Sequence, residues 1–108
     1  MWLVRDGEVL AAAERPATRR GRAKGLLGRD GVDGVLVLQP CRQVHTFRMR
    51  FAIDVAFFDR DGVIRRECTL APWRVSPLVW RAVGVLEAEA GALDRWELRV
   101  GDRIEIKP

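Results

Sequence analysis

Short apolar runs alternate with polar positions along the chain, and turn residues separate them. Residues 2–5 and 8–11 flank the pair Asp6-Gly7, which favours a type I′ turn because both central residues need positive φ. These two runs therefore predict a β-hairpin at the start of the chain. Residues 35–38 and 83–88 are apolar runs of strand length and predict two further strands.

The longest strand-like pattern lies in the middle of the chain. Within residues 44–51, the side chains of His45, Phe47, Met49 and Phe51 alternate with polar ones. Because successive side chains of a strand point to opposite faces, these four would share one face. The pattern predicts a strand over this segment.

Two more hairpins are expected after this segment. Residues 53–58 and 63–68 predict antiparallel strands around a turn at 59–62, which has Asp at its first and Gly at its fourth position. Residues 97–100 and 103–106 predict a hairpin at the C-terminus.

Helical patterns are few and short. Thr18 is a candidate N-cap for a helix over residues 19–28, although a glycine inside a helix costs about 1 kcal/mol relative to alanine, and this segment contains Gly21 and Gly25. Residues 90–96 have room for one or two helical turns. The elements together predict an α+β, mainly β fold: a small antiparallel barrel or sandwich of seven to eight short strands with one short N-terminal helix.

Composition is consistent with one globular domain over residues 1–108. Hydrophobic residues make up 48% and charged residues 31% of the chain, which excludes a disordered or collagen-like protein. No apolar run approaches the ~18 residues of a membrane helix, and the N-terminus lacks a signal-peptide pattern. We expect a monomeric cytoplasmic protein with no membrane partner, in which Cys41 and Cys68 are thiols.

The net charge of +4 is carried by 17 arginines and two lysines. Residues 15–29 hold six basic residues and no acid around a Gly-x-x-Gly pair, a loop that clamps nucleic acid in KH domains. Weak RNA binding is therefore an alternative hypothesis, with the candidate residues Arg19, Arg20, Arg22 and Lys24. Because most arginines alternate with apolar residues along predicted strands, we favour a solvated face and do not expect nucleic acid as the partner.

Charged residues within apolar strands mark a candidate site. Asp54 and Glu87 each stand in an apolar run, where a carboxylate is costly unless it is solvated or paired with a cation. A salt bridge, for which Arg29, Arg48 and Arg50 are the candidate partners, or an outward-facing carboxylate would be purely structural. The functional hypothesis is a shallow pocket in which polar groups converge over apolar walls, with the candidate ligand-binding residues Arg29, His45, Phe47, Met49, Asp54 and Glu87.

The leading hypothesis is a non-enzymatic module that binds an unknown small ligand or protein through this pocket. A hydrolase or lyase that uses His45 with Asp54 or Glu87 is an alternative, and it requires the acid and base to lie within ~3 Å of each other or of a shared water. We assign no catalytic residue, and we expect no cofactor. One histidine and two separated cysteines match no zinc-ligand spacing, so we expect no metal.

Two tryptophans flank the proline-containing segment 71–78, which must be a loop or an edge segment. Such rings either pack against the barrel or present an aromatic surface to a partner. We expect core packing for Trp73 and Trp80.

Four motifs resemble, in their order, the family known as domain of unknown function 192. They are Gly25-Leu26-Leu27-Gly28-Arg29, the run from His45 to Val63, Val85-Leu86-Glu87-Ala88-Glu89-Ala90-Gly91, and Val100-Gly101-Asp102. The resemblance covers roughly residues 17–106 and implies a compact β-rich α+β domain found mostly in prokaryotes, without an assigned activity. Leu27 stands where the family often has methionine and Ala52 where it often has proline, and many relatives look exported.

Overall fold

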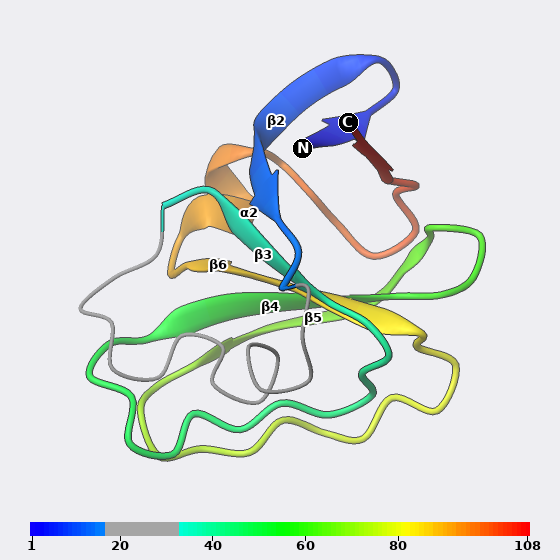
Figure 1. Cartoon of the computed structure of the whole chain (residues 1–108). Helices are drawn as coiled ribbons and strands as arrows, with labels where there is room; N and C mark the ends of the chain where they lie inside the picture. Colours follow the sequence, from blue (N-terminus) through cyan, green and yellow to red (C-terminus); the bar gives the residue numbers. More distant parts are fainter. Residues whose placement is uncertain (17–32) are drawn as a thin grey trace.

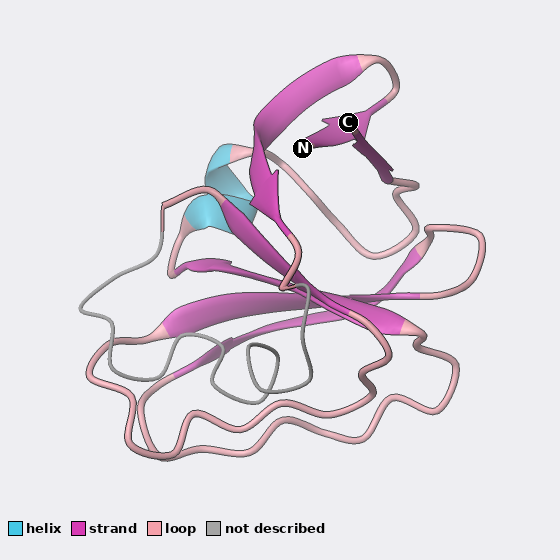
Figure 2. Ribbon diagram, viewed as in Figure 1, coloured by secondary structure: helices cyan, strands magenta, loops and turns pink. Residues whose placement is uncertain are grey.

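The computed structural model describes residues 1–16 and 33–108. Its described strands lie in one mainly antiparallel sheet, and the described helix α2 is a single turn over Ala92–Arg95 (Figures 1 and 2). The strands are β1 (Trp2–Arg5), β2 (Glu8–Glu14), β3 (Val35–Leu38), β4 (Ile53–Phe58), β5 (Ile64–Leu70), β6 (Gly84–Glu89) and β7 (Glu105–Lys107). In this part of the chain, no helix has the length and hydrophobicity needed to cross a membrane.

The predicted fold class is confirmed. The seven described strands have the order β5-β4-β6-β3-β2-β1-β7, and among them β2 with β3 is the one parallel pair. The sheet is not closed by a strand ladder. Backbone hydrogen bonds nevertheless connect its two edges. They run between residues 62–64, at the start of β5, and residues 101–104, just before β7. The sheet is therefore barrel-like.

The first two predicted hairpins are confirmed. Asp6 and Gly7 both have positive φ, as a type I′ turn requires, and Arg5 pairs with Glu8 across the turn. β4 and β5 pair antiparallel on either side of the predicted turn at 59–62. The predicted helix over residues 19–28 lies outside the described residues.

The predicted C-terminal hairpin is wrong. Residues 97–100 form no strand, and β7 instead pairs with β1, with Leu3 opposite Ile106. The described helical turn α2 precedes this segment and confirms the expectation for residues 90–96. The last strand thus completes an edge of the sheet through a contact with the chain's first strand.

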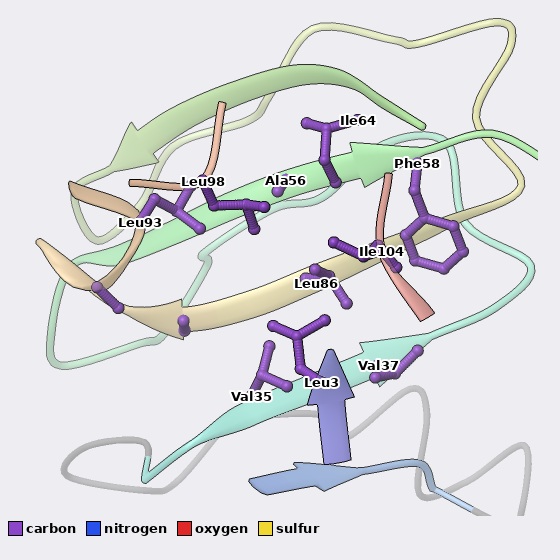
Figure 3. Close-up of a cluster of buried hydrophobic side chains, with 12 residues drawn as sticks. Leu3, Val35, Val37, Ala56, Phe58, Ile64, Leu86, Leu93, Leu98 and Ile104 are labelled. Carbon is purple, nitrogen blue, oxygen red and sulfur yellow. The ribbon is translucent and has the colours of Figure 1, made fainter. Parts of the chain in front are cut away.

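Two hydrophobic clusters occupy the two faces of the sheet. The inner cluster fills the barrel-like interior, where Leu86 of β6 lies together with Leu98 and Ile104 from the segment between α2 and β7 (Figure 3). The outer cluster lies on the opposite face and includes Val55 and Val85 together with Val44 and Met49 from irregular segments. A second layer of chain therefore covers the outer face.

That second layer consists of residues 39–52 and 71–83, which we call the loop layer. The two segments run side by side in Figure 1 and are joined by backbone hydrogen bonds from Val79 to Arg42, from Ser76 to Val44 and from Thr46 to Arg74. The predicted strand over residues 44–51 is wrong. Only His45 forms an isolated bridge there, and Arg48 has φ 66°, which breaks the alternation.

Candidate functional site

The register of β4 and β6 separates the two candidate carboxylates. Asp54 lies opposite Ala88, and Glu87 lies opposite Val55. Residues directly opposite one another point to the same face, and neighbours along a strand point to opposite faces. Asp54 therefore points to the inner face and Glu87 to the outer face, so the expectation that both share one pocket is wrong.

Asp54 serves as an anchor for the turn at α2. One carboxylate oxygen accepts a hydrogen bond from Thr69 Oγ1 at 2.6 Å. The other accepts backbone N–H bonds from Gly91 at 3.0 Å and Leu93 at 3.2 Å. The side chain is buried, and its bonds join β4, β5 and α2. This arrangement satisfies otherwise unpaired N–H groups at a helix start, which is a structural role rather than a binding one.

Glu87 is a buried carboxylate with no hydrogen-bond or ion-pair partner among the described residues. Glu87 is 4% exposed, and its cross-strand neighbours are Leu36 and Val55. Because burial penalises the charged form, it raises the pKa of the Glu87 carboxyl from 4.5 to about 7. Whether Arg29 pairs with this group stays a prediction, since Arg29 lies outside the described residues.

The Cys68 thiol lies on the same outer face, opposite Val55 on the neighbouring strand. Burial raises the pKa of this thiol, Arg66 opposes the rise, and Asp54 adds to it. Burial is the largest of these causes. A raised pKa disfavours the reactive thiolate.

His45 and Phe47 lie together on the surface of the loop layer. Their rings stack with centroids 4.7 Å apart, and Phe47 meets the Trp73 ring at 6.1 Å. The Phe47 N–H also donates to His45 Nδ1 at 3.4 Å. We call these three rings the aromatic stack. Met49 instead turns inward to the outer cluster, because the segment is not a strand.

Polar anchors hold the aromatic stack in place. The buried Thr46 hydroxyl donates to the Ala71 carbonyl at 2.6 Å and accepts the Arg74 N–H at 2.9 Å. The buried Ser76 hydroxyl accepts the Val44 N–H at 2.9 Å. These bonds replace the missing strand ladder and fix which side chains of the loop layer face outward.

The tryptophan expectation is wrong, because Trp73 is 59% and Trp80 74% exposed. Both belong to the loop layer, which carries five arginines and no aspartate or glutamate. These arginines are Arg42, Arg48, Arg50, Arg74 and Arg81. The sequence signal for this surface was a pair of segments, 39–52 and 71–83, that contain proline and arginine but no acid. The second of them also holds both tryptophans. The prediction of a strand over residues 44–51 obscured this signal.

In the described part of the chain, the pairing of His45 with a carboxylate that the enzyme alternative requires is not present. His45 forms no ion pair or hydrogen bond with a carboxylate there, and both oxygens of Asp54 are bonded elsewhere. No group of three or more possible metal ligands occurs in residues 1–16 and 33–108. The candidate RNA-binding residues Arg19, Arg20, Arg22 and Lys24 lie outside the described ranges.

The chain belongs to the family described as Uncharacterized ACR, COG1430, also called domain of unknown function 192, whose model matches residues 2–106. A crystal structure of a protein of unknown function from Novosphingobium aromaticivorans is 20% identical, with TM-score 0.76, and the match covers 87% of this chain and 74% of that one. A proposed transcription regulator from Sinorhizobium meliloti 1021 is 22% identical, with TM-score 0.78 and coverage of 96% and 89%. These likenesses concern the fold. Among curated proteins, none matches.

Proposed function

We propose that this member of the domain of unknown function 192 family is a non-enzymatic binding module that holds single-stranded nucleic acid on its loop layer. The observation that carries the proposal is the exposed aromatic stack on an arginine-bearing surface without acids. Exposed rings stack on bases of any sequence, and guanidinium groups bind phosphate in bidentate geometry. The two together match a polymer that offers planar bases and negative charge.

The sequence pattern disfavours nucleic acid because most arginines alternate with apolar residues along predicted strands. Arg48 and Arg74 instead lie in irregular segments, where both side chains are exposed beside the aromatic stack. Phe47 is 43% exposed although it is a large apolar residue. Keeping such rings in water is unfavourable, and a binding partner that covers them would relieve that cost.

Replacing Trp73 by alanine is expected to weaken binding of a fluorescein-labelled oligothymidylate of about 15 nucleotides roughly tenfold, because one stacked base contributes about 1–3 kcal/mol. Fluorescence anisotropy at about 50 mM salt measures the affinity, which should fall steeply as salt is raised. Trp2→Ala is the matched control, since Trp2 is 47% exposed on β1, outside the loop layer. Equal affinities of Trp73→Ala and wild type would contradict the proposal.

Binding of a small ligand at the Glu87 carboxylate is the second candidate function. It is favoured by Glu87, whose buried carboxylate has no partner among the described residues. A ligand with an ammonium or N–H donor would satisfy that group. In a thermal-shift screen of amine-bearing metabolites, a hit is expected to stabilise wild type more than Glu87→Gln. If no compound shifts the wild-type melting temperature, this candidate function loses its support.

A further inference from the structure

A second feature of the loop layer lies at the end remote from Trp73. There, residues 80–83 meet the turn between β4 and β5, and together they line a groove of about 340 Å³ around Trp80. The Val83 N–H donates to the Phe58 carbonyl at 2.9 Å, and Arg42 Nε donates to the Ala82 carbonyl at 3.3 Å. We call this feature the Trp80 groove.

Arginines dominate the charge of the Trp80 groove, whose charged lining residues are Arg42, Asp59, Arg60, Asp61, Arg65 and Arg81. Both carboxylate oxygens of Asp59 already have partners within the protein. Asp59 forms an ion pair with Arg65 at 2.7 Å and accepts hydrogen bonds from the N–H groups of Asp61 and Val63. Arg60 and Arg81 are exposed and form no ion pair with a described residue. Their guanidinium groups are available to an anion in the groove, where Asp61 is the remaining acid.

Trp80 supplies an apolar surface beside these cations. At 74% it has the largest exposed fraction among the large hydrophobic residues of the described part. An indole face next to guanidinium groups suits a ligand with a planar ring and a phosphate a few ångströms away. A groove of this volume is within the range of small-ligand sites.

We propose that the Trp80 groove binds one nucleotide, with its base on the Trp80 indole and its phosphate on Arg60 and Arg81. This inference rests on the proposed function where the nucleotide is a unit of the single strand. A free nucleotide offers the same chemistry. The two segments of the loop layer are hydrogen-bonded to each other along their length. The groove and the aromatic stack therefore lie along one continuous pair of segments, which we call the ribbon.

The distance along this ribbon sets the length of strand that reaches both ends. The register runs from Arg42 beside Val79 to Thr46 beside Arg74, which is four residue steps on the first segment and five on the second. At ~3.3 Å per fully extended residue, the first segment spans at most about 13 Å between these points. A strand of several nucleotides is therefore needed to occupy the aromatic stack and the Trp80 groove together. A strand of about 4 nucleotides is near the lower limit of such sites.

The test compares Trp80→Ala and the double variant Arg60→Ser/Arg81→Ser with wild type, Trp73→Ala and the Trp2→Ala control. The probes are thymidine monophosphate and labelled oligothymidylates of about 4 and about 15 nucleotides, measured at about 50 mM salt. Trp80→Ala is expected to weaken binding of the longer strand about tenfold. The double variant should weaken it similarly and reduce the slope of log affinity against log salt by about 1 to 2.

The outcomes separate this inference from the proposed function. If Trp73→Ala weakens binding while both groove variants bind all probes like wild type, the inference is overturned and the proposed function stands. If the groove variants weaken binding of the monophosphate while no variant changes binding of the longer strand, the inference stands for a free nucleotide and the proposed function fails. Trp80-dependent binding of the monophosphate supports a free nucleotide as ligand, whereas Trp80-dependent binding of the longer strand alone supports a unit of a polymer. No binding by wild type overturns both.

Discussion

Replacing Asp54 by alanine is expected to lower the free energy of unfolding by about 4 kcal/mol, since each buried bond to a charged group contributes about 1.5–3 kcal/mol and donors left unpaired are costly. The lost bonds come from Thr69 Oγ1 and from the N–H groups of Gly91 and Leu93. Those bonds join two strands to α2, so the turn that follows β6 should loosen as well. Urea denaturation monitored by circular dichroism measures the loss.

Two further variants show whether the effect belongs to this carboxylate. Asp54→Asn keeps the side-chain volume but replaces one acceptor oxygen by a donor, so its loss should be smaller than that of Asp54→Ala. Asp94→Ala removes an exposed carboxylate of α2 that pairs with Arg99 at 3.0 Å, and exposed pairs contribute at most about 1 kcal/mol. Unchanged stability of Asp54→Ala would contradict the anchoring role.

Local sequence patterns were sufficient for the first two hairpins and for most strands. The pair Asp6-Gly7 specifies its turn because few residues adopt two consecutive positive φ values. The turn at 59–62 likewise determines that β5 follows β4 as its antiparallel neighbour. In both cases, the deciding interactions lie within a few residues of one another, and a sequence pattern can express them.

The arrangement of the candidate site depends on contacts between distant parts of the chain. Alternation shows which residues within β4 share a face, but it does not show whether the face of Asp54 is also that of Glu87. That depends on the register between β4 and β6, and a shift of one residue would reverse the answer. The sequence therefore indicates two buried carboxylates, whereas their relative position depends on the pairing of distant strands.

The loop layer illustrates a different limit of pattern reasoning. Residues 44–51 alternate like a strand, yet the positive φ of Arg48 and the side-chain anchors of Thr46 give an irregular path. Because of this path, Phe47 faces solvent and Met49 faces the outer cluster. Tertiary hydrogen bonds with residues 71–83 outweigh the local preference for an extended strand.

Glu87→Gln is expected to be more stable than wild type by about 3 kcal/mol at pH 8 and equal to it at pH 4, since one pKa unit corresponds to about 1.4 kcal/mol. The carboxyl has a pKa of about 7 in the folded chain and 4.5 as its ordinary value. At a pH between these two pKa values, the Glu87 carboxyl has lost its proton in the unfolded chain but keeps it in the folded chain. Rising pH therefore favours unfolding of wild type, and the neutral amide of glutamine escapes this effect.

Denaturation curves of both proteins between pH 4 and pH 8 test the expectation, with Glu89→Gln as the control. Glu89 is on the same strand, but its side chain is 64% exposed, so its variant should differ from wild type by no more than about 0.5 kcal/mol. If Glu87→Gln is no more stable than wild type at pH 8, a cation must hold the carboxylate in its charged form. That result would contradict an unpartnered Glu87 and favour the pairing with Arg29 that the sequence suggests, because a buried charge is tolerated when a guanidinium compensates it.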